Sequence, residues 1–225
     1  MKNFRLTFIL FSLVLASLLS LGCTGTEDTE TNTPATDDTQ AAASLAEMQV
    51  SVKSDLRWVR ARVFETRLGQ ALLLDESALC EELGIYSCVN DVHLVALGGN
   101  DPYEKALYEP MASPSATTPI AVERLVVSAC VAAVEKEKGA AQQFVFLDLD
   151  LNAESLDVLN PVENQAISDT IVSLYRRFHS RNPLPQEEVL ARELLVDGDG
   201  NPVSASAFAQ AACIAIGSTS EAVFY

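Results

Sequence analysis

The chain has 225 residues, of which 31 are acidic and 15 are basic, so its formal net charge at pH 7 is −16. This acidic excess argues against nucleic-acid binding, which needs basic patches, and against electrostatic docking on anionic lipid. The length is enough for one domain with its own hydrophobic core.

The first 22 residues have the pattern of a secretory signal peptide. Lys2 and Arg5 precede an apolar run over residues 6–21, and the sequence turns polar directly after it. A membrane-spanning helix needs about 20 apolar residues, so this run is short for a span and typical of a signal. We therefore expect residues 1–22 to be removed on export.

The end of the apolar run carries a processing motif. Leu21-Gly22-Cys23 resembles the lipobox of bacterial lipoproteins, with Ser20 at a place where Leu is usual. The resemblance implies that Cys23 becomes lipidated and N-terminal after cleavage, and that the lipid anchors the chain to a membrane. Thr24 stands where an Asp would resemble an inner-membrane retention signal, which favours the outer membrane. An ordinary cleaved signal with a chance cysteine is the alternative.

A tether is expected to follow the lipidated cysteine. Residues 23–43 are rich in Thr, Asp and Glu and contain no basic and no large apolar residue after Cys23. Such a segment cannot bury enough apolar surface to fold, and its like charges extend it. We therefore divide the chain into a signal peptide (1–22), an anchored acidic tether (23–43) and one folded domain (44–225).

Four cysteines remain in the folded domain: Cys80, Cys88, Cys130 and Cys213. An even number in an exported chain predicts two disulfides, for which three connectivities are possible. The short separation of the first two favours one bond between them and a second bond between Cys130 and Cys213. The sequence contains no C-x-x-C and no C-x-x-C-H, so it lacks these signatures of thiol, metal and haem chemistry.

The first half of the domain begins with an apolar stripe at steps of three and four residues, which predicts one long amphipathic helix. Its members are Leu45, Met48, Val52, Leu56, Val59 and Val63. A second, short helix is expected from an Asp75 cap to Leu83, with Gly84 as its stop. The segment 92–97 is expected to be a short strand or buried extended chain. A turn at 98–102 and an irregular loop to Thr117 follow, and long loops of this kind are often functional.

The second half of the domain contains clear helix starts. Thr118 and Pro119 open a helix that Gly139 ends, Pro161 opens a helix to about Phe178, and Pro185 precedes a third over 187–195. Ser204 or Ser206 begins the last helix after a turn at 197–202. The segment 143–150 is expected to be a strand or extended chain over the core. The predicted fold class is mainly α: a disulfide-braced helical domain of about six helices with one or two short extended segments.

The C-terminal third carries two phrases, at 174–188 and 211–225. The first contains Tyr-Arg-Arg at 175–177, an Arg-x-Pro turn at 181–183 and Pro-x-x-Glu at 185–188. Both phrases resemble helical domains of exported myxobacterial and planctomycete proteins, over about residues 165–225. The resemblance implies an exported helical domain in which Arg and Glu fix a turn and aromatic side chains pack, and it implies no activity.

One loop offers a candidate binding site. Asp91 stands next but one to His93, where a carboxylate can orient an imidazole, and further polar side chains that could complete a metal or acid–base site follow. The candidates are Asp91, His93, Asp101, Tyr103 and Glu109. Their spacing matches no metal motif, and a His between Val92 and Leu94 is more often structural.

The sequence as a whole predicts an exported lipoprotein, anchored to the outer membrane, whose helical domain serves in interaction or assembly. This hypothesis includes an envelope or surface protein as partner, no nucleic acid, no cofactor, no metal and no catalytic residue. The alternative is an exported enzyme or metal-binding protein that uses the loop around His93–Glu109.

Overall fold

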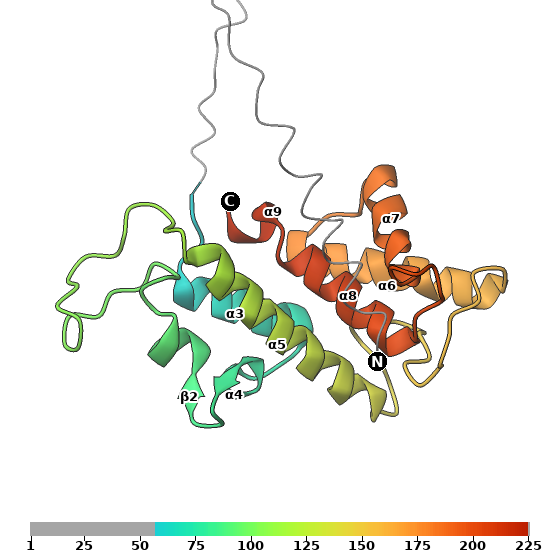
Figure 1. Ribbon diagram of the computed structural model, residues 1–225, viewed down its shortest axis with the longest axis horizontal. Coiled ribbons are helices and arrows are strands. Elements are labelled where there is room, and N and C mark those ends of the chain that lie inside the picture. Colours follow the sequence, from blue (N-terminus) through green and yellow to red (C-terminus); the bar gives the residue numbers. More distant parts are fainter. Residues whose placement is uncertain (1–56, 225) are drawn as a thin grey trace, which may run out of the picture. The chain divides into compact units, whose positions relative to one another are not determined.

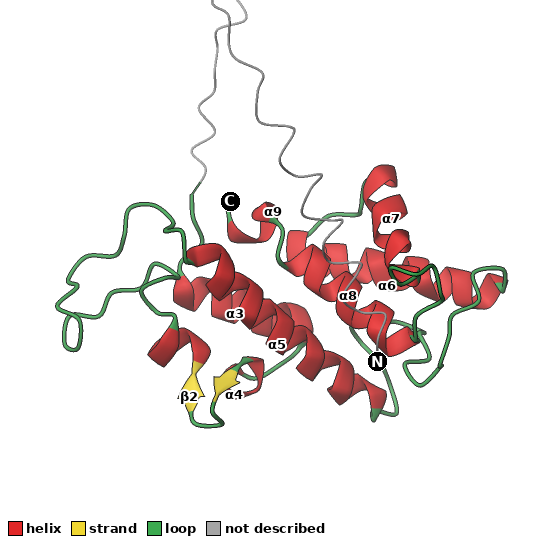
Figure 2. Cartoon of the chain, in the orientation of Figure 1, coloured by secondary structure: helices red, strands yellow, loops and turns green. Residues whose placement is uncertain are grey.

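The structure, a computed structural model, describes residues 57–224, and these residues are mainly helical (Figures 1 and 2). The signal peptide, Cys23, the tether and the part of the first predicted helix before Arg57 lie outside the described residues. Among the described helices, none is long and apolar enough to cross a membrane.

Four helices form a closed ring in which α3 contacts α5, α5 contacts α8, α8 contacts α6 and α6 contacts α3 (Figure 1). They are α3 (Ala61–Leu72), α5 (Thr118–Lys138), α6 (Pro161–His179) and α8 (Ala205–Gly217). Their apolar faces meet in one core that includes Leu68, Leu125, Ile171 and Phe208. Shorter elements lie around the ring: α4 (Glu76–Leu79), α7 (Pro185–Arg192) with a 3₁₀ turn (Glu193–Leu195), and α9 (Ser220–Val223). The predicted class, a mainly helical disulfide-braced domain, is confirmed.

The helix starts in the second half follow the capping residues. Asn160 caps α6 through its side chain, which accepts from the Val162 N–H, and Ser204 caps α8 by accepting from the Ala207 N–H. Pro stands in the first turn of α5, α6 and α7, where its missing N–H costs nothing. In α5 the capping position is Thr117, one residue earlier than expected.

Both predicted disulfides are present. Cys130–Cys213 joins the middle of α5 to α8, and both residues are completely buried. Gly217, one turn after Cys213, lies close to Val126, one turn before Cys130, so the two helices run antiparallel. Cys80–Cys88 closes a short hairpin formed by β1 (Glu81–Glu82) and β2 (Tyr86–Ser87).

The prediction of one long first helix is wrong for residues 57–60, whereas residues 61–63 are helical as predicted. Residues 57–60 are not helical, and α3 begins only at Ala61. Trp58 forms a β-bridge with Phe224, and the Val59 N–H donates to the Val223 carbonyl at 2.8 Å. This pairing with the far end of the chain overrides the local periodicity, so Val59 is buried while Val63 is exposed.

The second helix is shorter than predicted, because α4 ends at Leu79 rather than at Leu83. Cys80 has an extended backbone (φ −166°, ψ 124°), and its carbonyl accepts from the Cys88 N–H as the first rung of the hairpin. The covalent bond to Cys88 holds the chain in this reversal. Gly84, expected as a helix stop, lies instead in the hairpin turn, and Asp75 occupies the capping position without a side-chain capping bond.

The segment 92–97 is neither a strand nor extended. A π-helical turn (Cys88–Val92) leads into turns that end at Gly98. Local bonds explain this: Asp91 Oδ2 accepts from the Ser87 N–H at 2.7 Å, and the Ser87 hydroxyl accepts from the Asn90 N–H at 3.1 Å. The Leu97 carbonyl is used by the Ala61 N–H, so it helps to start α3.

The segment 143–150 runs over the core as bends and turns rather than as a strand. The buried Glu137 carboxylate, in the last turn of α5, accepts from three successive N–H groups of residues 144–146 at 2.8–3.0 Å. From α6, the Ser173 hydroxyl donates to the Val145 carbonyl and Arg177 donates to the Phe144 carbonyl. Side chains thus supply the hydrogen-bond partners of these backbone N–H and C=O groups, which in a sheet would come from a neighbouring strand.

Candidate functional site

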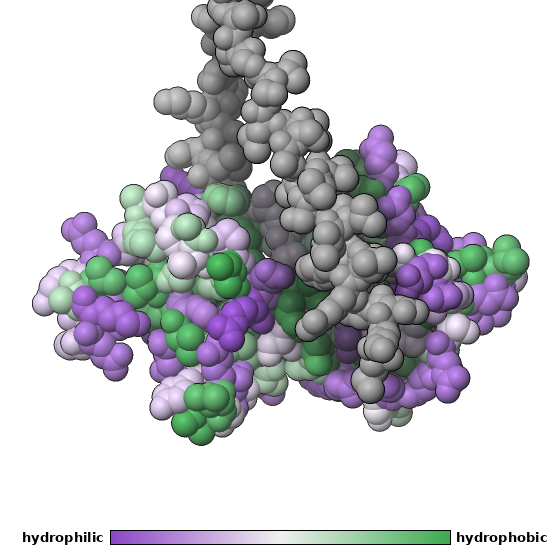
Figure 3. Space-filling model, in the orientation of Figure 1, coloured by the Kyte–Doolittle hydropathy of each residue, from purple (hydrophilic) through white to green (hydrophobic). Residues whose placement is uncertain are grey.

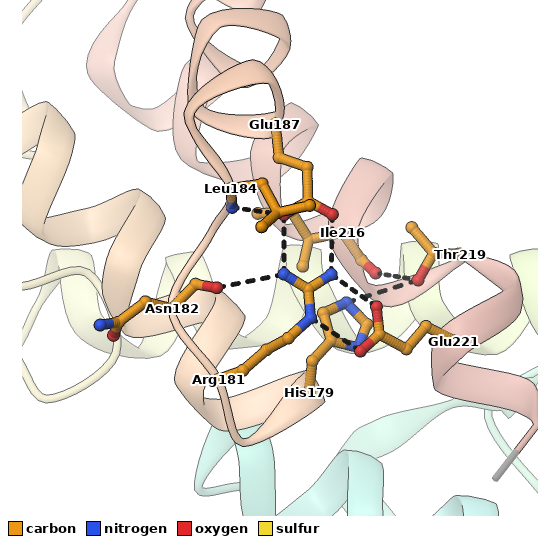
Figure 4. Close-up of polar contacts among 8 residues, drawn as sticks. All are labelled: His179, Arg181, Asn182, Leu184, Glu187, Ile216, Thr219 and Glu221. Atoms are coloured by element: carbon orange, nitrogen blue, oxygen red, sulfur yellow. Dashed lines mark hydrogen bonds and ion pairs between the residues drawn. The ribbon is translucent and has the colours of Figure 1, made fainter.

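A dense polar cluster lies just beyond the end of α6, where it joins three helices (Figure 4). Arg181 donates two hydrogen bonds of 2.7 Å to the Glu187 carboxylate on α7. It donates two more, of 2.8 and 2.6 Å, to the Glu221 carboxylate on α9. Its guanidinium also stands 5.3 Å from the centre of the Tyr175 ring. We call Arg181, Glu187 and Glu221 the Arg181 cluster.

Paired bonds from one guanidinium lower the pKa of both carboxylates. The hydrogen bonds from Arg181 lower the pKa of Glu187 to about 2 and also lower the pKa of Glu221. Glu187 additionally accepts from the Leu184 N–H at 2.7 Å, which fixes the start of α7. The cluster is therefore charged near neutral pH, and both carboxylates are bound to the one guanidinium.

His179 lies beside the Arg181 cluster, and burial lowers the pKa of its imidazole. Its Nε2 atom is 3.4 Å from the hydroxyl of Thr219, and that hydroxyl donates to the Ile216 carbonyl. This geometry suits the neutral ring with its proton on Nε2. The Nδ1 atom is buried and has no hydrogen-bond partner within the described part of the chain. A neutral imidazole held in this way fits a packing role better than proton transfer.

A cavity of about 520 Å³ opens beside the cluster, between α3, the end of α6 and α9. Aromatic rings line it (Phe64, Phe178 and Phe224), together with the charged groups of Arg67, Arg177 and Glu221. Those charged groups are already engaged: Arg177 donates to the Ala71 and Phe144 carbonyls, Glu221 accepts from Arg181, and Arg67 also has an interaction partner. The hydrogen bonds of the Arg181 cluster therefore hold α6, α7 and α9 together.

The predicted pair Asp91 and His93 does not form. Asp91 uses its carboxylate to cap the turn at Ser87. His93 Nε2 instead lies 3.3 Å from the Glu82 carboxylate on β1, although the angles there do not suit a hydrogen bond. The same Glu82 oxygen is 3.0 Å from the Arg124 guanidinium on α5. These groups fasten the hairpin to α5.

The other predicted loop residues are engaged within their own turn or face solvent. Asp101 Oδ1 accepts from the Glu104 N–H at 2.9 Å, and Oδ2 is 3.8 Å from the Lys105 ammonium group. The Tyr103 side chain is 96% exposed and Glu109 is exposed. Between residues 57 and 224, no group of three or more His, Cys, Asp or Glu side chains is arranged to hold a metal ion. An enzymatic use of this loop stays a prediction.

A feature that sequence reasoning missed is a hydrophobic projection. The hairpin turn exposes Leu83, Ile85 and Tyr86, which we call the hairpin tip. Figure 3 shows apolar side chains at the end of the knob that projects at the lower left. The sequence pattern that could have indicated it is Leu-Gly-Ile-Tyr at residues 83–86, between Cys80 and Cys88. The prediction of a helix that ends at Leu83 hides this signal, because one face of a helix end is expected to be buried.

A second exposed set lies in the long irregular loop over 99–117, which carries Tyr103 and Tyr108 and lies in the same half of the body as the hairpin (Figure 1). Exposed tyrosines suit protein interfaces, because the ring buries apolar area while the hydroxyl stays hydrogen-bonded. This loop and the hairpin tip form the best candidate interaction surfaces.

No protein-family model, curated protein or solved structure matches this chain.

Proposed function

We propose that this chain is an exported lipoprotein, held at the outer membrane by a lipid on Cys23, whose folded body is a non-enzymatic interaction domain. The observation that carries the proposal is the pair of disulfides. Disulfides persist in oxidising compartments outside the cytoplasm. All the cysteines that follow Cys23 are used in these two bonds, which leaves Cys23 as the one cysteine available for a lipid.

Three further features support an interaction role for the body. The polar groups of the Arg181 cluster are bound to one another, so they hold helices rather than a substrate. Large apolar and aromatic side chains are exposed on the hairpin tip and on the loop over 99–117. The acidic tether would lift these surfaces away from the bilayer, towards a protein partner in the envelope or at the surface.

Metabolic labelling with a palmitate analogue, followed by membrane fractionation, tests the anchor. The wild-type chain is expected to carry the label and to sediment with outer membranes, and Cys23→Ala is expected to lose both properties. Thr24→Ala is the matched control, because it changes the next residue and leaves the cysteine in place. Equal labelling of the Cys23→Ala variant would contradict the proposal.

Thiol alkylation of the denatured chain, taken directly from cells, tests the compartment independently. For wild-type chain that carries the palmitate label and sediments with membranes, we expect no reactive thiol at any of the four cysteines of the body. If Cys80, Cys88, Cys130 and Cys213 are alkylated without prior reduction, the chain matures in a reducing compartment and the proposal is wrong.

A further inference from the structure

The hairpin between Cys80 and Cys88 is a small, covalently closed projection. Its two strands have only two residues each, and the turn closes with the Ile85 N–H donating to the Glu82 carbonyl at 3.2 Å. A hairpin this short is not stable on its own in water. The disulfide and the contacts of Glu82 with His93 and Arg124 keep it formed and fixed to the body.

The turn presents its apolar side chains to solvent. Leu83 is 88% exposed and Ile85 is 71% exposed, although burial is favourable for both side chains. Leu83 also adopts a left-handed backbone (φ 56°), directly before Gly84 at φ 70°. A residue with a branched side chain is disfavoured there, where Asn, Asp or Gly is the usual choice. Neither the folding of the turn nor its solubility explains a leucine at this position.

Another leucine with a left-handed backbone shows the contrast. Leu73 (φ 55°) ends α3: its N–H bonds to the Gly69 carbonyl, and its own carbonyl accepts from the Lys136 ammonium group. Its conformation therefore has a structural cause in helix termination. At Leu83 a turn closed by a disulfide instead holds a hydrophobic side chain outward, where it can serve as an aliphatic anchor that inserts into a pocket on a partner.

The charge around the hairpin tip indicates what that pocket contains. Residues 68–104 include no Lys or Arg, and five acidic residues lie close to the hairpin in sequence: Asp75, Glu76, Glu81, Glu82 and Asp91. Of these, Glu82 is matched by Arg124. An anionic lipid surface would repel the rest, whereas a rim of Lys and Arg side chains around an apolar pocket would attract them.

The geometry points to the hairpin tip as a docking element, pre-formed by the Cys80–Cys88 disulfide, that inserts Leu83 and Ile85 into an apolar pocket with a basic rim on a partner protein. Pre-formation lowers the entropy cost of docking, because the turn is ordered before it binds. The exposed tyrosines of the loop over 99–117 supply further contact area. This inference rests on the proposed interaction function and names the element and the partner chemistry.

Photo-crosslinking of the full-length chain in its native cells tests the inference. The photoreactive amino acid p-benzoylphenylalanine replaces Ile85 in one strain and Leu159 in a control strain, because Leu159 is at least as exposed as the hairpin residues (89%) and lies in another turn. We expect the probe at position 85 to cross-link the chain to one partner protein. The cross-linked residue of that protein is expected to lie in an apolar pocket whose rim carries Lys or Arg side chains. The probe at position 159 is expected not to cross-link to that protein.

A second pair of variants separates docking from folding. Leu83→Asn suits a left-handed turn residue, so the chain should fold at least as well as the wild type. It should nevertheless lower the cross-link yield from position 85 at least tenfold, while Leu159→Asn leaves that yield unchanged. A cross-link to lipid, to a second copy of this chain or to the same protein from position 159 overturns the inference. So does the absence of any cross-link, or an unchanged yield in Leu83→Asn.

Membrane sedimentation of the same samples keeps the two proposals apart. If the chain is found outside the membrane fraction but the specific cross-link forms, the anchor is wrong and the docking element stands. If the chain sediments with membranes and position 85 gives no specific product, the docking element is wrong and the anchor stands.

Discussion

Gly98 allows Trp58 to pack beside the start of α3. A Cβ atom at position 98 would stand 2.8 Å from the indole ring, and the backbone there is left-handed (φ 76°). Gly98→Ala is therefore expected to lower the free energy of unfolding by about 2–4 kcal/mol, from backbone strain and overpacking together. Urea denaturation measures this. Gly139→Ala, where nothing lies within 4 Å, should change it by less than about 0.5 kcal/mol, and equal effects would contradict the packing argument.

Glu137 is a buried acid whose partners are backbone N–H groups. Glu137→Ala leaves the three donors of residues 144–146 without their acceptor, and an unsatisfied buried donor costs about 1–3 kcal/mol. Because some of these donors regain water, we expect a loss of about 3 kcal/mol in the free energy of unfolding. Glu135→Ala, at an exposed position on the same helix, is the control. A similar loss in both variants would mean that the carboxylate does not hold this segment.

Among the covalent links between elements, the Cys130–Cys213 bond closes a much longer loop than Cys80–Cys88. The sequence separations are 83 and 8 residues. In the chain-entropy model, removing the long-range bond by a double Cys→Ala change costs about 4.5 kcal/mol and removing the short one about 2.5 kcal/mol. Chemical denaturation of the two double variants should show this order. The reverse order would indicate that the hairpin bond does more than close its own turn.

The Arg181 cluster ties α7 and α9 to the end of α6, and its contribution depends on pH. The folded-state pKa of Glu187 is about 2, below its usual 4.5, so the stabilisation is fully present above about pH 4.5 and is lost as the pH falls towards 2. The lowered pKa of His179 acts in the same direction, beginning below its ordinary value of 6.5.

Glu187→Gln isolates the carboxylate's part of this effect. The pair is partly exposed to solvent, so we expect a loss of only about 1 kcal/mol at pH 7 and a shallower decline of stability between pH 4.5 and pH 2 than in the wild type. Thermal unfolding at a series of pH values measures both. Parallel pH profiles for the two proteins would show that the ion pair does not contribute.

Sequence patterns predicted the helix boundaries that neighbouring residues in the sequence determine. Pro161 and Ser204 mark helix starts through caps and fixed backbone angles, and both predictions are confirmed by the structure. The start of α3 and the end of α4 could not be predicted in this way. Trp58 pairs with Phe224 across the whole domain, and Cys80 takes its conformation from a bond to Cys88.

The candidate sites likewise differ in how far their contacts could be predicted from local sequence. The resemblance implied that Arg and Glu fix a turn after α6, and Arg181 does bind Glu187. Its second partner, Glu221, is 40 residues away, so no local pattern could identify it. The loop residues around His93 are close in sequence, but their side chains have separate partners: Asp91 caps the turn at Ser87, and Asp101 accepts within its own turn.

At the scale of the whole molecule, we propose a membrane anchor, an acidic tether and a disulfide-braced helical body whose exposed apolar side chains contact a partner. The anchor is the central claim, because it decides the compartment in which every other part acts. Mass spectrometry of the mature N-terminus, on chain purified from native membranes, tests it most directly. The account predicts a first residue Cys23 that carries a diacylglyceryl group and no trace of residues 1–22. An unmodified Cys23, or a mature chain that begins elsewhere, would contradict it.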